Sequence, residues 1–113
     1  MLTITTQKKT ILKLEKRIGN RLGQLGSVGA MRPGSLNKQY RDKEKQKGIY
    51  YQLSYTHKMR SRTEHVWVDH VPRLKKEIAE YKKFKRLSTE VIDLSIELSK
   101  AKIALLRMQS DGD

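Results

Sequence analysis

Residues 48–68 read GIYYQLSYTHKMRSRTEHVWV, and this stretch decides the fold class. Aromatic and β-branched residues alternate with polar ones on both sides of the segment HKMR, which is typical of two antiparallel strands. A turn centred between Lys58 and Met59 pairs Leu53 with Glu64 and gathers the aliphatic residues on one face. A slip of one residue would instead move Trp67 onto that face. The opposite face then holds Tyr50, Gln52, Ser54, Thr63, His65 and Trp67.

The segment before the hairpin predicts a helix and one further strand. Residues 7–26 have an apolar stripe at intervals of three and four residues, which indicates an amphipathic helix. Gly19 and Gly23 lower helix propensity there, which indicates either a closely packed neighbour or early fraying of the helix, and we expect the packed neighbour. Residues 35–41 predict a short strand, so the β region spans residues 35–68. The helical stripe consists of Ile11, Leu14, Ile18, Leu22 and Leu25.

Residues 69–108 predict one long helix that covers the sheet and continues beyond it. Asp69 is expected as the N-cap, and Pro72 falls in the first turn, where a missing N–H is tolerated. Over residues 87–108 an apolar row alternates intervals of four and three, which predicts a coiled-coil segment. The row consists of Leu87, Val91, Leu94, Leu98, Ala101, Leu105 and Met108, with Ile92, Ile96, Ile103 and Leu106 as a second row beside it.

These elements define an α+β fold with an N-terminal helix, a small antiparallel β-sheet and a long C-terminal helix ending in a coiled-coil segment. With 113 residues, the chain is expected to form a single basic domain. The coiled-coil segment needs a partner, which is either the first helix or a second copy of the chain. We expect a homodimer through the C-terminal helix, with a monomer as the alternative. The residues expected at this interface are Leu87, Val91, Leu94, Leu98 and Leu105.

Positive charge dominates the chain and is unevenly distributed. The 25 Lys and Arg outnumber the 12 Asp and Glu, for a net charge of +13. Residues 1–86 hold 22 basic against 7 acidic residues, whereas residues 87–113 hold 3 against 5. The excess is larger than solubility requires and indicates a polyanionic partner, most often nucleic acid.

The candidate nucleic-acid-binding residues lie before the hairpin, at its tip and along the first half of the long helix. Lys and Arg would bind phosphates, while hydrogen-bonding side chains between aromatic ones suit base edges or unpaired bases. The alternative for that aromatic face is a sheet covered on both sides. The predicted set is Arg32, Lys38, Arg41, Gln52, Ser54, Lys58, Arg60, Arg62, Lys75, Lys76, Lys82, Lys83 and Arg86.

Side chains suited to catalysis or metal binding are scarce. The chain has no Cys, which excludes thiolate chemistry. His57, His65 and His70 match no metal-binding spacing, and the carboxylates form no catalytic pair. We therefore expect neither an enzyme nor a metal or cofactor. No apolar run approaches the roughly 20 residues that span a bilayer, and we expect a cytoplasmic, nucleoid-associated protein.

Three segments together resemble a known group of proteins. They are MRPGSLNKQYR at residues 31–41, GIYYQLSYTHKMRSRTEHV at 48–66 and VPRLKKEIAEYKKFKRL at 71–87. Over residues 31–98 the chain resembles an uncharacterised family of small basic bacterial and archaeal proteins, often encoded near transposases. Many of its members carry a cysteine cluster where this chain has RDKEKQKG. The resemblance implies an association with mobile elements.

The hairpin followed by a helix is also similar to the arm-type DNA-binding domains of tyrosine recombinases, in which a three-stranded sheet enters the major groove. That similarity implies that Gln52, Ser54, Lys58, Arg60 and Arg62 face the groove. We therefore expect a non-enzymatic protein that binds double-stranded DNA, as an accessory or regulatory protein of a mobile element. Two alternatives stay open: an RNA-binding component of a ribonucleoprotein, and a coiled-coil adaptor that recruits a partner protein.

Overall fold

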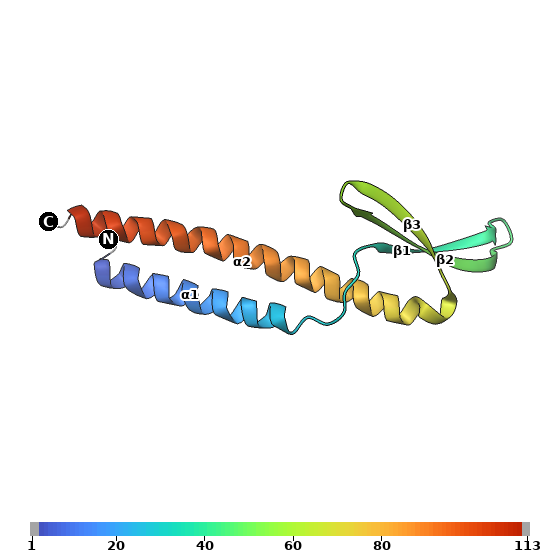
Figure 1. The fold of residues 1–113 in the computed structure, drawn as a ribbon, viewed down its shortest axis with the longest axis horizontal. Helices are drawn as coiled ribbons and strands as arrows, with labels where there is room; N and C mark the ends of the chain where they lie inside the picture. Colours follow the sequence, from blue (N-terminus) through green and yellow to red (C-terminus); the bar gives the residue numbers. More distant parts are fainter. Residues whose placement is uncertain (1–2, 112–113) are drawn as a thin grey trace. The chain divides into compact units, whose positions relative to one another are not determined.

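The computed structural model describes residues 3–111. It confirms the predicted α+β fold, with a helix, an antiparallel sheet and a long helix in that order (Figure 1). The elements are α1 (Ile4–Gly26), β1 (Ser35–Asp42), β2 (Lys47–His57), β3 (Arg60–Val66), the 3-10 helix η1 (Val68–His70) and α2 (Val71–Asp111).

The chain divides into two compact units, where the sequence predicted one domain. The sheet unit comprises residues 28–83, and the helical unit comprises α1 with the part of α2 from residue 84 onward. Each unit has its own apolar cluster. The division follows from the apolar pattern of α2, because its first turns pack on the sheet and its later turns pack on α1.

The sheet has the strand order β1-β2-β3, and all its pairs are antiparallel. The predicted hairpin register is confirmed, since Leu53 pairs with Glu64. β1 runs along the other edge of β2, with Leu36 opposite Leu53. Lys58 and Met59 form the β2–β3 turn with φ of 52° and 63°, the positive values at both central positions that a type I′ turn requires.

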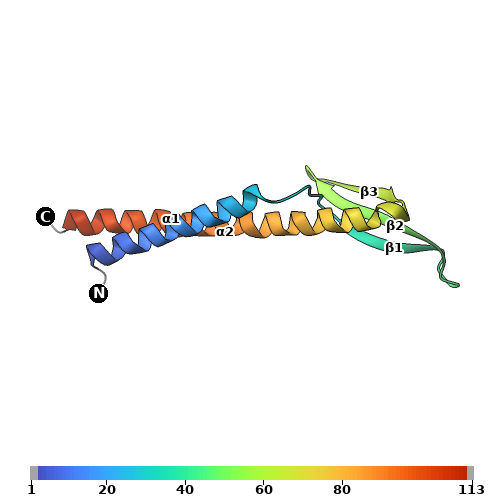
Figure 2. The same ribbon diagram turned by 90° about the horizontal axis from the view of Figure 1, so that it is seen from below.

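One face of the sheet packs on the first turns of α2 (Figure 2). Leu53, which is fully buried, forms a cluster with Val66 of β3 and with Val71 and Ile78 of α2. Burying one such aliphatic side chain stabilises the fold by about 2 kcal/mol. The chain leaves β3 at Val66, two residues earlier than predicted, and turns through η1 into α2. Asp69 therefore lies in η1 and is not the N-cap of the long helix.

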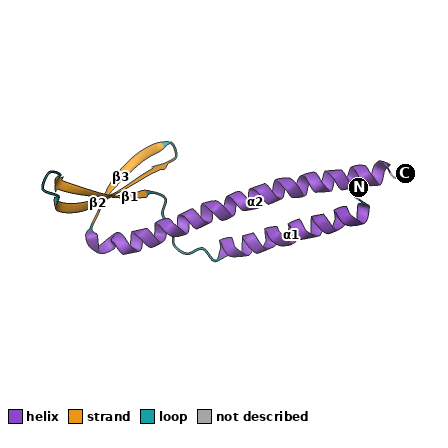
Figure 3. Ribbon diagram, turned by 180° about the vertical axis from the view of Figure 1, so that it is seen from behind, coloured by secondary structure: helices purple, strands orange, loops and turns teal. Residues whose placement is uncertain are grey.

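In the helical unit α1 and α2 lie side by side in antiparallel directions (Figure 3). Ile11 and Leu14 of α1 pack against Leu94 and Ala101 of α2, with Ile18, Leu98 and Leu105 around them. The buried Gln7 donates its Nε2 hydrogen bond to the Ala101 carbonyl at 3.0 Å. Because this bond ties the start of α1 to a late turn of α2, it fixes the register between the two helices.

The glycines of α1 do not mark a close helix contact. A Cβ atom built at Gly19 or Gly23 meets nothing within 4 Å, so the expected packed neighbour is wrong. Both residues lie on the exposed side of α1. The helix also begins earlier than predicted, because the Thr3 side chain accepts a hydrogen bond from the Thr6 N–H at 3.0 Å and caps the first turn.

Candidate nucleic-acid interface

The face of the sheet turned away from α2 is made of polar and aromatic side chains. Side chains alternate along a strand, so Gln52 and Ser54 point away from the side where Leu53 is buried. Strand pairing places Asn37 and His65 on either side of Gln52. All of these residues are exposed or half-buried. The members of this open face are Ser35, Asn37, Gln39, Tyr50, Gln52, Ser54, Thr63 and His65, with Trp67 directly after β3.

An aromatic row crosses the open face from β2 to the end of β3. The rings of Tyr50 and His65 are stacked with centroids 5.9 Å apart, and His65 meets Trp67 edge-on at 5.2 Å. Trp67 is 69% exposed. The prediction that Tyr50, His65 and Trp67 share one face agrees with these contacts. Exposed aromatic faces of this kind suit stacking on nucleic-acid bases.

Basic residues stand at both ends of the open face. The β1–β2 loop carries Lys43 and Lys45, and Arg41 precedes it on the open face. Gly48 has a φ of 72°, and a Cβ there would lie 3.0 Å from the Arg41 Cβ, so glycine makes room for the Arg41 stem. Lys58 and Arg60 lie at the other end, at the β2–β3 turn, where Arg60 pairs with His57 and by alternation shares the face of Arg62.

These two basic ends are separated by the length of β2. Its 11 residues span about 35 Å at the rise of an antiparallel strand. One turn of duplex DNA has nearly the same length, about 34 Å. The open face therefore matches a stretch of groove that has phosphates available at both ends.

The hairpin register separates two of the predicted site residues. Gln52 is on the open face, whereas Arg62 pairs with Tyr55 on the face turned toward α2. Lys38 lies on that same face, 5.5 Å from the centre of the Tyr40 ring. Both cations are exposed and reach solvent at the edges of the sheet. They are placed for phosphates and not for the base edges that the open face would meet.

The lysines of α2 form a second basic group. Lys75 and Lys82 line a groove beside the start of β1, together with Gly34, Ser35 and Leu36. Lys76 is exposed and Lys83 is half-buried in the same helix. Arg86 belongs to the helical unit. Of the nucleic-acid-binding residues predicted on the long helix, Lys75 and Lys82 are therefore the two that lie beside a strand.

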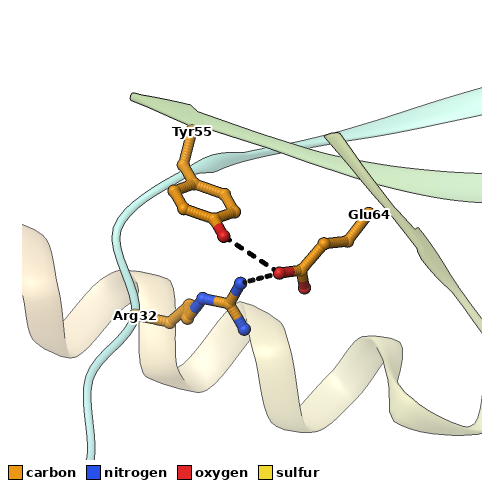
Figure 4. Close-up of polar contacts among 3 residues, drawn as sticks. All are labelled: Arg32, Tyr55 and Glu64. Atoms are coloured by element: carbon orange, nitrogen blue, oxygen red, sulfur yellow. Dashed lines mark hydrogen bonds and ion pairs between the residues drawn. The ribbon is translucent and has the colours of Figure 1, made fainter. Parts of the chain in front are cut away.

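Arg32 has a structural role in the sheet unit (Figure 4). Its Nη2 donates to Glu64 Oε1 at 2.7 Å, and the Tyr55 hydroxyl donates to the same oxygen at 3.0 Å. The Arg32 guanidinium also stacks over the Tyr55 ring at 4.9 Å, and its backbone N–H donates to the Glu77 carbonyl. The hydrogen bond with Glu64 raises the pKa of Arg32, and the same bond lowers the pKa of Glu64.

The residues predicted at an oligomer interface lie inside the helical unit. Leu94, Leu98 and Leu105 pack against α1. Leu87 is buried and Val91 is half-buried. Of the two partners that the sequence left open for this row, α1 is the one that packs on it. A second copy could reach these residues only by displacing α1, so dimerisation needs another surface.

Sequence reasoning missed the contribution of β1 to the open face. Ser35, Asn37 and Gln39 join it because they pair with Ser54, Gln52 and Tyr50. The alternation of these polar residues with Leu36 and Lys38 was the available signal. This alternation identifies the open-face residues of β1 only once the register between β1 and β2 is known. That register pairs residues of two strands, and neither strand encodes it alone.

No family model, no curated protein and no solved structure matches this chain. The resemblances to a mobile-element family and to recombinase arm domains therefore stay predictions. Across residues 3–111 there is no group of three or more His, Asp and Glu side chains arranged to hold a metal ion. None of the helices in this part of the chain combines the length and apolar character needed to cross a membrane.

Proposed function

We propose that this protein binds double-stranded DNA without catalysing a reaction, and that the open face of its sheet lies in the major groove. The observation that carries the proposal is the composition of this face, where Asn37, Gln52 and His65 lie side by side across three strands and Thr63 lies opposite Ser54 in the next row. Asn and Gln form paired hydrogen bonds with adenine in the major groove, and Thr contacts several bases. A β element fits that groove.

Charge supports the same assignment. The sheet unit contains 14 Lys and Arg against 6 Asp and Glu. Lys58 and Arg60 at the β2–β3 turn, and Lys43 and Lys45 in the β1–β2 loop at the opposite end of β2, would bind phosphates beside the groove. These contacts give salt-dependent affinity without sequence preference, whereas the open face would supply the preference. An accessory or regulatory role in a mobile element is part of this proposal.

A second candidate function rests on the aromatic row. Trp67 is 69% exposed beside His65 and Tyr50, and such rings stack on unpaired bases. Sequence-specific RNA recognition mostly targets unpaired bases. A single-stranded or looped RNA is therefore the alternative ligand, and it would use Trp67 more than Gln52.

Selection from a random-sequence DNA duplex library tests the main proposal. We expect the wild-type chain to enrich a short consensus that contains adenines. The variant Asn37→Ala/Gln52→Ala should lose this consensus and bind it at least about 30-fold more weakly, because each of the two paired hydrogen-bond contacts to a base contributes about 1–3 kcal/mol of discrimination. Binding to unselected duplex should change little.

The matched control is Asn20→Ala/Gln24→Ala, which removes the same side chains from exposed positions of α1. It should keep the wild-type consensus. If no consensus emerges, or if both double variants lose it equally, the open face does not read bases. Loss of RNA-loop binding in Trp67→Ala, with duplex binding unchanged or absent, would favour the second candidate.

A further inference from the structure

The helical unit presents a second apolar surface on α2. Ile92, Ile96, Ile103 and Leu106 are 59%, 49%, 50% and 65% exposed. With Ser99 they alternate intervals of four and three, and we call these five residues the outer row. At 100° per residue, the outer row lies roughly 140° around α2 from the row that packs on α1. The helix thus has two apolar stripes on nearly opposite sides.

An amphipathic helix on the surface of a monomer has one apolar stripe, which faces the core. A second stripe at heptad spacing indicates a second helical partner. A shallow groove runs along the outer row and is lined by Ser95, Ser99 and Lys102 together with Leu98, Ile103 and Leu106. The two small serines leave space for a helix to approach closely between the longer side chains.

We propose that the outer row binds the outer row of a second copy of this chain in antiparallel orientation. Charge determines both the partner and the direction. Residues 87–113 hold 3 basic and 5 acidic residues, whereas the rest of the chain is strongly basic. Two copies therefore meet least repulsion along this part of α2, and a strongly basic chain repels itself elsewhere.

The direction follows from the charges that flank the outer row. Asp93 lies beside its first half, and Lys102 and Arg107 lie beside its second half; all three are exposed. An antiparallel pair centred near Ser99 brings Asp93 of each copy close to Arg107 of the other copy. A parallel pair would bring Lys102 of one copy near Arg107 of the other, where like charges repel.

Such a dimer joins the same surface patch on both copies, as two-fold symmetry requires. Ile92 would face Leu106 of the second copy, and Ile96 would face its Ile103. The row that packs on α1 stays in place, so association needs no rearrangement of the helical unit. The inference does not depend on nucleic-acid binding, and the two are tested by separate measurements.

Sedimentation equilibrium of the full chain without nucleic acid tests the proposal. At about 100 μM, a Kd of about 1 μM or lower would leave nearly all of the protein dimeric, at twice the 13.2 kDa chain mass. Ile96→Glu/Ile103→Glu should weaken association by on the order of 100-fold or more. Both positions are exposed, so the helical circular dichroism signal should be retained. The matched control, Leu12→Glu/Leu22→Glu, changes exposed leucines of α1 and should stay dimeric.

A charge exchange tests the direction. Asp93→Arg alone and Arg107→Asp alone should each weaken the dimer, and the two together should restore it. A wild-type chain that is monomeric at about 100 μM, well above that Kd, would overturn the proposal and indicate a different protein as the occupant of the outer row. A dimer that survives Ile96→Glu/Ile103→Glu, or is lost in the α1 control instead, would also overturn it.

Discussion

Arg32 and Glu64 form an ion pair at 2.7 Å that joins the segment before β1 to the middle of β3. Tyr55 of β2 completes the arrangement, because its hydroxyl donates to the same Glu64 oxygen and its ring lies under the Arg32 guanidinium. Three parts of the sheet unit are thereby held on the side of the sheet that faces α2. Arg32 therefore has a structural function, whereas its charge alone would predict a contact with nucleic acid.

Removal of the Glu64 charge should make this contribution measurable as a function of pH. The pKa of Glu64 is lowered in the folded chain, chiefly by the hydrogen bond from Arg32. The carboxylate therefore stabilises the fold above the unfolded pKa of about 4.3, and this stabilisation is lost as the pH falls through the lower folded pKa. Since the pair is partly exposed, with side chains 31% and 45% accessible, we expect about 0.5–1 kcal/mol.

Urea denaturation of wild type and Glu64→Gln between pH 3 and pH 7 checks this expectation. The free energies of unfolding should differ at neutral pH and converge toward pH 3. A constant difference across the range would show that the carboxylate charge contributes nothing there. The similarly accessible pair Arg21 and Glu90 in the helical unit, 2.6 Å apart, offers Glu90→Gln as the matched control.

Gly34→Ala should destabilise the sheet unit. Gly34 has a φ of 143°, and a Cβ there would lie 2.7 Å from Leu53 Cδ1 and 3.1 Å from the Ser54 carbonyl oxygen. Leu53 is fully buried in the sheet cluster, so it has no space into which to move. Strain and overpacking together should cost about 2–4 kcal/mol, measured as a lower urea midpoint. A midpoint equal to wild type would mean that the segment before β1 is not held as described.

Gly19→Ala should have the opposite effect. A Cβ at this position of α1 meets nothing within 4 Å, so alanine adds helix propensity without a clash. The expected gain is about 0.5–1 kcal/mol, seen as a higher midpoint. A loss of stability would instead indicate a neighbour at this glycine, such as another chain, and would change the assignment of the free surfaces of α1.

The β2–β3 turn should accept a more favourable sequence. Lys58 and Met59 have φ of 52° and 63°, and non-glycine residues with positive φ cost about 1 kcal/mol each. Asn-Gly is the preferred pair for such a turn, so Lys58→Asn/Met59→Gly should raise the free energy of unfolding by about 1–2 kcal/mol. If the tip contacts DNA, the same variant should bind duplex more weakly despite its greater stability. Unchanged affinity would remove the tip from the interface.

The sequence predicted the elements and the hairpin register because each rests on a local pattern. Alternation placed Leu53 and Gln52 on opposite faces, and the turn position fixed the pairing of Tyr51 with Val66. Three other features depend on contacts between distant residues: the partner of Leu94, the ion pair of Arg32 and the side of β1 that carries Asn37. Charge and hydrophobic periodicity indicate that a residue needs a partner, but they do not identify that partner.

The salt dependence of duplex binding tests the central claim most directly. Fluorescence anisotropy of labelled duplex DNA, duplex RNA and single strands should be measured across a salt series, with the salt concentration stated for each affinity. The proposal predicts tightest binding to duplex DNA, with log affinity falling by several units per unit of log salt, about 0.9 for each phosphate contacted. Weak binding of every nucleic acid at moderate salt, or affinity that is independent of salt, would contradict it.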